Sequence, residues 1–267
     1  MLRDLNRSEW LSWLNLPGEL VPQALLLRGT RNLKRHYVAH QEYFEDIVHV
    51  DSPNGLFEDV FVGRFGDTRV GYASVYGAAM ASEIVHVFGV LGTRLVIQTG
   101  CCGALAPELH VGDLFVAEEA HCGEGAAQYY RRDAARVRAS IPFDRWRGLP
   151  GADSATLARG SIFTTAALLA EGADQLAAWR AGGFDAVDME TATTFAVAEH
   201  FGMERASILF VFDNPRHSDH MLAGDSANAA RRPVANQRMI ELALAMIARW
   251  GGQIAPPASS QTGFQTP

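Results

Sequence analysis

The sequence predicts an α/β fold: a single-domain, three-layer α/β/α arrangement around a central mixed, mostly parallel twisted sheet. Apolar runs typical of strands alternate with segments of helical periodicity along most of the 267 residues. The composition, 48% apolar and 20% charged, is that of an ordinary globular protein. A chain of this length can bury roughly 70% of its unfolded surface in one core. We therefore expect one domain over residues 1–250 and a disordered, Pro-, Ser- and Gln-rich tail over 251–267.

The N-terminal part predicts two helices and a strand. Residues 8–14 form a short amphipathic pattern that Ser8 caps, and its tryptophans are expected to cover a groove on the body. An apolar strand over 23–27 precedes a turn and a helix that reaches Phe44. Residues 57–65 and 68–76 flank Gly66-Asp67, which favours a hairpin.

The remaining elements follow from apolar periodicity and from glycines at segment ends. A helix over 79–91 ends at Gly92, and the buried strand over 94–99 breaks at Gly100. Residues 131–160 look like an irregular insertion. The other expected elements are strands at 113–118, 184–187 and 206–212, and helices at 164–181, 190–201 and 234–250.

Charge and cysteine usage exclude several classes of protein. A net charge of −7 without a run of Lys or Arg disfavours nucleic-acid binding, which needs a positive face. Three cysteines without CxxC or Cys/His spacing indicate neither a disulfide framework nor zinc. The N-terminus lacks the apolar core of a signal peptide, and no segment is long and apolar enough to span a bilayer. We expect a cytoplasmic protein with no metal site.

The first strand end rich in candidate residues surrounds Gly29. Arg28, Arg31, Lys34 and Arg35 lie close to it in the sequence. Glycine lets backbone N–H groups approach a ligand, and arginine forks match phosphate oxygens, so this segment is a candidate anion pocket. The alternative is a solvated, basic start of a helix.

Three further strand ends carry glycine or carboxylates. Gly100 and Gly103 follow a buried strand, which is also typical of a simple tight turn. Glu190 begins a helix, where a carboxylate either favours the helix dipole or accepts hydrogen bonds from sugar hydroxyls. Asp213 ends an apolar strand, where it either starts an Asp-Asn-Pro turn or acts as a desolvated general acid.

The motifs together resemble the nucleoside phosphorylase-I family, which includes purine nucleoside and uridine phosphorylases and methylthioadenosine/adenosylhomocysteine nucleosidases. The matching segments are Gln98-Thr-Gly-Cys-Cys-Gly-Ala104 with Val111-Gly-Asp113, Val187-Asp-Met-Glu-Thr-Ala192, Ser207 to Asp213, and Glu124 to Tyr130. Their order and spacing fit over about residues 22–250.

The resemblance implies a role for each matching residue. Glu190 would bind the ribose hydroxyls, Met189 would pack on the sugar, and Asp213 would protonate purine N7 as the catalytic acid. Phe163 would pack on the base. The implied binding residues are Gly29, Arg31, Arg35, Thr99, Gly100, Cys101, Gly103, Phe163, Met189 and Glu190. The implied reaction uses inorganic phosphate as co-substrate and no cofactor, in a homo-oligomer (dimer or hexamer).

Two departures from the family pattern bear on the activity. Gln98 stands where family phosphorylases carry an arginine, so a phosphate anchor is missing unless Arg31 or Arg35 supplies it. The first strand end offers no glutamate that could activate water, which disfavours hydrolysis. The leading hypothesis is therefore a phosphorylase of purine nucleosides. The alternatives are a hydrolytic nucleosidase, a non-catalytic nucleoside-binding protein and, less favoured, a uridine phosphorylase, because no arginine follows Leu168 until Arg180.

Overall fold

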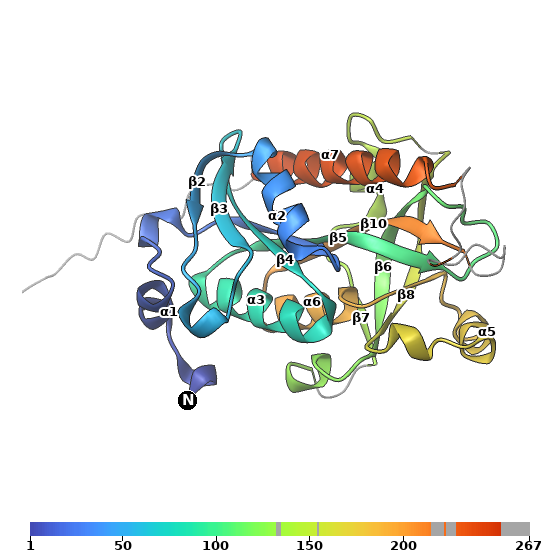
Figure 1. Cartoon of the computed structure of the whole chain (residues 1–267), viewed down its shortest axis with the longest axis horizontal. Helices are drawn as coiled ribbons and strands as arrows, with labels where there is room; N and C mark the ends of the chain where they lie inside the picture. Colours follow the sequence, from blue (N-terminus) through green and yellow to red (C-terminus); the bar gives the residue numbers. More distant parts are fainter. Residues whose placement is uncertain (132–134, 154, 215–221, 223–227, 252–267) are drawn as a thin grey trace, which may run out of the picture.

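A mixed ten-stranded sheet separates two groups of helices in the computed structural model (Figure 1). The structure describes residues 1–131, 135–153, 155–214, 222 and 228–251. The strands are β1 (Ala24–Gly29), β2 (Glu45–His49), β3 (Val60–Phe65), β4 (Thr68–Val75), β5 (Leu95–Ala104), β6 (Leu114–Gly123), β7 (Arg136–Arg138), β8 (Leu157–Thr165), β9 (Ala186–Asp188) and β10 (Glu204–Asp213). The α-helices are α1 (Arg7–Trp13), α2 (Leu33–His40), α3 (Gly77–Leu91), α4 (Phe143–Arg147), α5 (Ala173–Ala181), α6 (Thr191–His200) and α7 (Arg231–Gly251).

The sheet is open at one end and closed on itself at the other. Its strand order is β10-β6-β8-β9-β5-β1-β4-β3-β2, with β7 on β6. A further pairing of β10 with β5 joins β5, β9, β8, β6 and β10 into a ring. The sheet is mixed: the pairs β1–β4, β1–β5, β5–β10, β6–β8 and β8–β9 are parallel, and the other pairs are antiparallel. Strands β1, β5 and β10 are parallel neighbours, so their carboxyl ends lie together.

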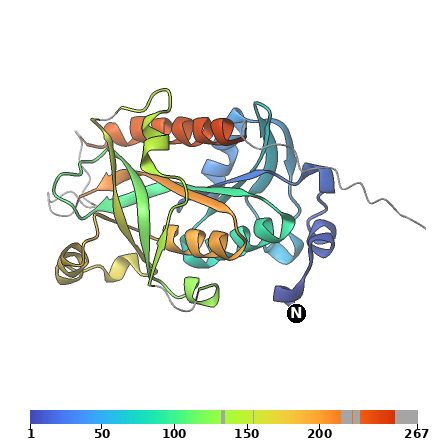
Figure 2. The same cartoon turned by 180° about the vertical axis from the view of Figure 1, so that it is seen from behind.

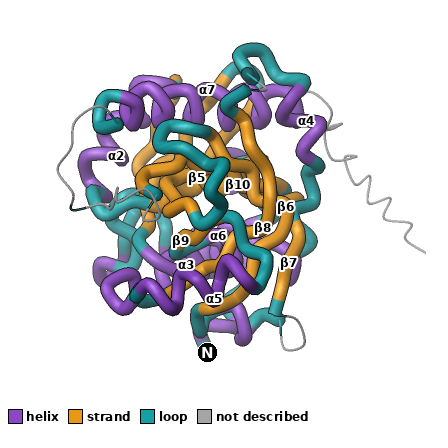
Figure 3. Tube along the Cα trace, turned by 90° about the vertical axis from the view of Figure 1, so that its right-hand side faces the viewer, coloured by secondary structure: helices purple, strands orange, loops and turns teal. Residues whose placement is uncertain are grey.

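Helices cover both faces of this sheet, as the three-layer prediction requires. Helices α7, α2 and α4 lie on one face, and α3 and α6 lie on the other (Figures 1 and 2). The end-on view places the strands between α7 and the α3–α6 pair (Figure 3). The apolar stripe of α7 is confirmed: Met239, Leu242, Ala243, Met246 and Trp250 are all buried in the core beneath it. Among the described residues, no helix combines the length and apolarity needed to cross a bilayer.

Several predicted elements are confirmed with small shifts at their ends. The hairpin at Gly66-Asp67 joins β3 to β4, and α3 ends at Gly92, whose φ of 98° is left-handed. Helix α1 is present, but its cap is Asn6 rather than Ser8, because Asn6 and Glu9 form a reciprocal capping box. Trp10 is buried as expected, whereas Trp13 is exposed.

Three predictions about the chain between 94 and 181 are wrong. Strand β5 does not break at Gly100 but continues to Ala104, because β10 and then β9 pair with its second half. Residues 131–160 are not an irregular insertion, since they contain β7, α4 and the start of β8. The expected helix over 164–181 is confined to α5, because the β-branched and aromatic run Ile162 to Thr165 belongs to β8.

The edge strand β2 was not predicted. Three of its five residues are exposed and the other two are half-buried, so their apolar pattern is weak. The predicted tail over 252–267 lies outside the described residues.

Candidate active site

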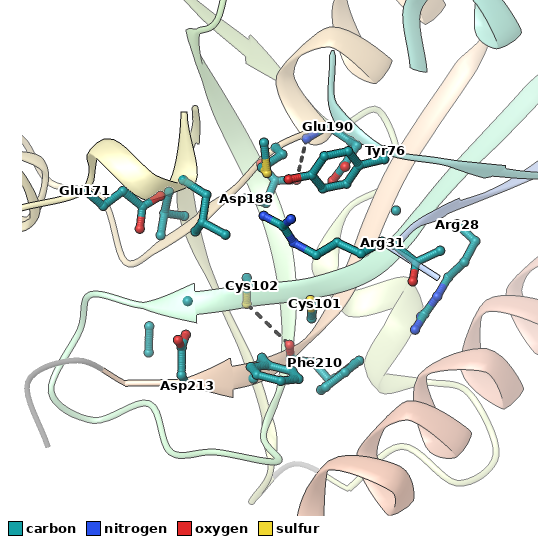
Figure 4. Close-up of a pocket in the computed structure, with 18 of the residues that line it drawn as sticks. Arg28, Arg31, Tyr76, Cys101, Cys102, Glu171, Asp188, Glu190, Phe210 and Asp213 are labelled. Carbon is teal, nitrogen blue, oxygen red and sulfur yellow. Dashed lines mark hydrogen bonds between the residues drawn. The ribbon is translucent and has the colours of Figure 1, made fainter. Parts of the chain in front are cut away.

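A cavity of about 330 Å³ opens at the carboxyl ends of β1, β5 and β10. Residues from β1, the β1–α2 turn, β5, the β9–α6 junction and β10 line it, so segments far apart in the sequence meet here. Seven predicted site residues line this cavity: Gly29, Arg31, Cys101, Gly103, Met189, Glu190 and Asp213. Figure 4 shows Arg28 at one end, Glu171 and Asp213 at the other, and Arg31 between them.

Glu190 is held rigidly at the start of α6. Its side chain is buried, and one carboxylate oxygen, Oε1, accepts a hydrogen bond of 2.7 Å from the Gly77 amide of α3. Burial, together with the neighbouring Asp188 carboxylate, raises the pKa of Glu190 to about 8. A Cβ at Gly29 would lie 2.7 Å from Glu190 Oε2, so only glycine allows this approach. The second oxygen of Glu190 is therefore placed against the strand end of β1.

Asp188, two residues before Glu190, has the structural role of a carboxylate at the start of a helix. Its carboxylate accepts hydrogen bonds from the Thr164 hydroxyl at 2.7 Å and from the Thr191 amide at 2.8 Å. Burial raises the pKa of Asp188. The group fixes the first turn of α6 against β8, which positions Met189 and Glu190 in the cavity.

Asp213 stands at the end of β10, after a shift of register between Val211 and Asp213 in the pairing with β5. The partner residue on β5 is Gly103, and a Cβ there would lie 3.1 Å from Asp213 Oδ1. Glycine at this position therefore leaves room for the carboxyl group at the mouth of the strand. The next residue, Asn214, is buried and donates 2.8 Å to the Leu109 carbonyl, which anchors the strand end.

Arg28 is a buried cation that our choice of site residues omitted. Its side chain is 3% exposed, with one nitrogen donating 2.6 Å to Asn236 Oδ1 of α7. Its Nε has no hydrogen-bond partner, and it forms no ion pair with any described residue. The sequence held a signal for it, because Arg28 directly precedes Gly29 in the candidate anion pocket, but the residues carried over from the family resemblance were Arg31 and Arg35.

Arg31 lies in the middle of the cavity and is exposed there. Its guanidinium stacks over the Tyr76 ring with 4.7 Å to the ring centroid. Such stacking favours a cation without neutralising it. Arg35, the other predicted phosphate ligand, is exposed on α2 and does not line the cavity.

Cys101 points into the cavity from β5 (Figure 4). Burial raises the pKa of its thiol to about 11, so the group is a neutral thiol at pH 7. A neutral thiol is a poor nucleophile but can still donate a weak hydrogen bond.

Three other predicted residues do not line the cavity. Thr99 is fully buried and donates 2.9 Å to the Leu27 carbonyl, and Gly100 packs against Gly29. Phe163 stacks on Trp179 at 4.4 Å between ring centroids, in an apolar cluster that includes Leu105 and Leu176 of the cavity lining. Tyr130, at the end of the matching segment Glu124 to Tyr130, packs against His86 and does not line the cavity either.

Gln98 is fully buried beneath the cavity rather than part of its wall. Its Oε1 accepts a hydrogen bond of 3.3 Å from Thr194, and its Nε2 donates 3.1 Å to the Thr99 carbonyl. The amide is thus satisfied within the protein and does not serve as an anion ligand.

The far wall of the cavity is apolar and was missed by sequence reasoning. Leu105, Leu168, Leu176 and Phe212 contribute to it. Glu171 adds one carboxyl group to this wall. No single motif marks these residues, because they come from four separate segments. The cavity thus has the positive charge of Arg28 at one end and an apolar wall at the other. The Glu190 carboxyl lies between the two ends, and the Glu171 and Asp213 carboxyls lie at the apolar end.

Such a cavity can hold an anion near Arg28 and Arg31, a hydroxyl-bearing group at Glu190, and a planar apolar group near Asp213. Among the described residues, no group of three or more His, Cys, Asp or Glu side chains could hold a metal ion.

Comparison with known proteins gives a consistent result. Residues 35–248 match the family described as the Phosphorylase superfamily. A DeoD-type purine nucleoside phosphorylase of Geobacillus kaustophilus (strain HTA426) is 28% identical over 250 residues, which cover 88% of this chain and 96% of the relative. A DeoD-type enzyme of Clostridium beijerinckii is 24% identical and covers 88% of this chain and 97% of the relative.

The fold is shared with a solved uridine phosphorylase from Vibrio fischeri ES114. The superposition has a TM-score of 0.71 at 20% identity and covers 87% of this chain and 94% of the other.

Proposed function

The chain belongs to the phosphorylase superfamily, and from this premise we propose that it cleaves the N-glycosidic bond of a purine nucleoside with inorganic phosphate. The observation that carries the proposal is a buried arginine without an ion pair among the described residues, in the same cavity as Glu190 and Asp213. A buried charge without a counter-ion costs free energy, so the cavity favours an anionic ligand. The products are the free base and a pentose 1-phosphate.

The chemistry follows from the charges that develop as the bond breaks. Positive charge grows on the sugar ring and negative charge on the leaving base. Asp213 is positioned to place a proton on purine N7, which neutralises the base. The phosphate anion stabilises the sugar cation and attacks its anomeric carbon. Glu190, fixed by Gly77, accepts hydrogen bonds from the ribose hydroxyls.

Arg28 and Arg31 replace the missing arginine of the central strand as phosphate ligands. Gln98 is neutral and already hydrogen-bonded, whereas Arg28 has an unpartnered Nε and Arg31 lies in the cavity. Arg35 does not line the cavity, so the proposed phosphate site does not include it. This combination supports phosphorolysis over hydrolysis.

The DeoD-type relatives support a purine base over a pyrimidine. The proposed reaction needs neither a metal nor an organic cofactor, because the proton and the nucleophile come from Asp213 and phosphate. We also propose a cytoplasmic homo-oligomer, a dimer or a hexamer, consistent with exposed apolar side chains such as Trp13 and Tyr129.

The decisive experiment measures release of free base from a panel of nucleosides, each with and without phosphate. Phosphate-dependent release of purines together with ribose 1-phosphate is the expected result. Release without phosphate would make the protein a nucleosidase. The one feature that favours this hypothesis is Gln98, which stands where family phosphorylases carry an arginine. Binding without cleavage of any nucleoside would overturn the catalytic proposal.

A further inference from the structure

Glu171 is a carboxyl group in the cavity that the reaction described above does not use. It lies between the short 3-10 helix Leu168–Ala170 and α5, and its side chain lines the apolar wall beside Leu168 and Leu176. Its Oε1 is buried and has no hydrogen-bond partner among the described residues. An unpaired carboxyl oxygen in such a wall costs free energy that a ligand group can recover.

The position of Glu171 relative to Asp213 suggests which ligand group that is. Both carboxyls lie at the same end of the cavity (Figure 4). Burial, and then the nearby charge of Asp213, raise the pKa of Glu171 to about 7. If Asp213 faces N7 of a purine, a neighbouring carboxyl faces the adjacent group on that edge of the base, which is the substituent at C6.

We propose that Glu171 reads the C6 substituent of the purine: ionised, it accepts a hydrogen bond from a 6-amino group, and protonated, it donates one to a 6-oxo group. The inference rests on the proposed function. A carboxylate has only acceptors, whereas the protonated acid has one donor and keeps an acceptor, so only the protonated form can match a 6-oxo group. The ionised form against a 6-oxo group would bring two acceptors together in a desolvated wall.

Other charged groups around this cavity do not replace Asp213 as the partner of Glu171. Arg28 and Arg31 come from the β1 end, and Asp188 and Glu190 from the β9–α6 junction. Asp174, three residues along the chain in α5, is exposed and does not line the cavity. Of these groups, Asp213 is the one whose charge acts on the Glu171 carboxyl.

The direction of the pH effect follows from the raised pKa. Below pH 7 Glu171 is mostly protonated and can match a 6-oxopurine, and above pH 7 it is mostly ionised and favours 6-aminopurines. From pH 6 to pH 8 the ionised fraction of a group with this pKa rises roughly tenfold. Titration of Asp213 or of phosphate affects both substrates alike, so it cancels in the ratio of their rates.

The test measures kcat/KM for adenosine and inosine with saturating phosphate between pH 6 and pH 8. The adenosine-to-inosine ratio is expected to rise at least tenfold over this range in the wild-type protein. In Glu171→Gln the ratio should vary less than twofold, because an amide donates and accepts at every pH. Glu171→Leu should remove both hydrogen bonds and also flatten the ratio. Asp174→Asn, which removes an exposed carboxylate nearby, should retain the wild-type slope.

A flat ratio in the wild-type protein, with both nucleosides cleaved, would overturn this inference and leave the proposed function intact. A slope that persists in Glu171→Gln would also overturn it. Absence of purine cleavage at every pH would instead defeat the proposed function, and this inference with it.

Discussion

The two ends of the cavity are built differently. At the β1 end, Arg28 is packed among core side chains, with Asn236 and Met239 of α7 against its guanidinium. At the opposite end, Asp213 finishes a strand and Glu171 sits in a short connection between helices. The first end carries a fixed charge, since arginine stays protonated, whereas burial and mutual repulsion bring a carboxyl of the second end to a pKa near neutrality. One end is thus suited to holding an anion and the other to moving a proton.

The largest effect should come from removing the acid. In Asp213→Ala we expect kcat for adenosine or inosine to fall by ~10²–10⁴, with a smaller change in KM, because a positioned general acid typically contributes that much. Steady-state phosphorolysis with each nucleoside measures it.

A substrate control separates proton donation from general damage to the site. A nucleoside methylated at N7 already carries positive charge on the base and needs no proton to leave. Its turnover should fall far less in Asp213→Ala. Equal losses on both kinds of substrate would remove Asp213 from the role of acid.

The next effect tests the fixed charge. Arg28→Met should raise the KM for phosphate by about a hundredfold, because truncating one partner of a buried charge pair costs about 2–5 kcal/mol. The same change should leave thermal stability unchanged or higher, since without phosphate the buried charge has no counter-ion among the described residues.

Arg35→Met serves as the matched control, because Arg35 is exposed on α2 and does not line the cavity. It should not alter the KM for phosphate. An unchanged phosphate KM in Arg28→Met, with a large rise in Arg31→Met, would transfer the anchor to Arg31.

The difference between these two arginines shows where sequence reasoning reached its limit. Neighbours along the chain suggested a cluster of basic residues, but the twist of β1 into α2 sends Arg28 into the core and Arg35 to solvent. Spacing alone does not reveal this, because a strand alternates the two faces of the sheet and the following helix restarts the pattern. The helical layers and the positions of most strands along the chain were predictable from periodicity, whereas the order of the strands in the sheet was not predicted.

At the end of the cavity that holds the carboxyl side chains, the sequence predicted only the residues that a motif marks. Glu190 and Asp213 lie at or just after strand ends, so both were predicted as site residues, and both line the cavity. Glu171 follows no strand, and its importance depends on β8 and α5 bringing it to Asp213. The prediction of a long helix over 164–181 hid that arrangement. The resemblance implied that Phe163 packs on the base, whereas in the structure Phe163 stacks on Trp179 and is not among the residues that line the cavity.

A smaller effect concerns the sugar, midway between the two ends. Glu190→Ala should reduce the preference for ribosides over 2′-deoxyribosides by up to about tenfold, because a hydrogen bond contributes about 0.5–1.5 kcal/mol. The ratio of kcat/KM for adenosine and 2′-deoxyadenosine measures it. Glu190→Gln, which keeps an acceptor, should retain more of the preference. Equal activity on both sugars in the wild-type protein would exclude a contact with the 2′-hydroxyl.

The smallest effect is on the pH dependence of stability, and it comes from His40, whose pKa the charge of Arg28 helps to lower. His40 of α2 is 1% exposed and stacks on Tyr72 with 4.5 Å between ring centroids. Its Nε2 has no hydrogen-bond partner among the described residues. Burial, and then the charge of Arg28, lower the pKa of His40 from 6.5 to about 3. Because the folded pKa lies below the unfolded one, the stability from neutral His40 is complete above pH 6.5 and is lost as the pH falls toward 3.

Replacing this histidine should therefore make the fold less sensitive to acid. At pH 5.5 the wild-type protein should lose about 1 kcal/mol of unfolding free energy through this group, since each pH unit below the unfolded pKa costs up to about 1.4 kcal/mol. His40→Phe keeps an aromatic ring on Tyr72 without a titrating group, so its loss between pH 7.5 and pH 5.5 in urea unfolding should be smaller by that amount. Carboxyl groups with raised pKa values, such as Glu190, act in the opposite direction but equally in both proteins. An identical pH dependence in the two proteins would show that the pKa of His40 is the same in the folded and unfolded states, and hence that neither burial nor the charge of Arg28 lowers it.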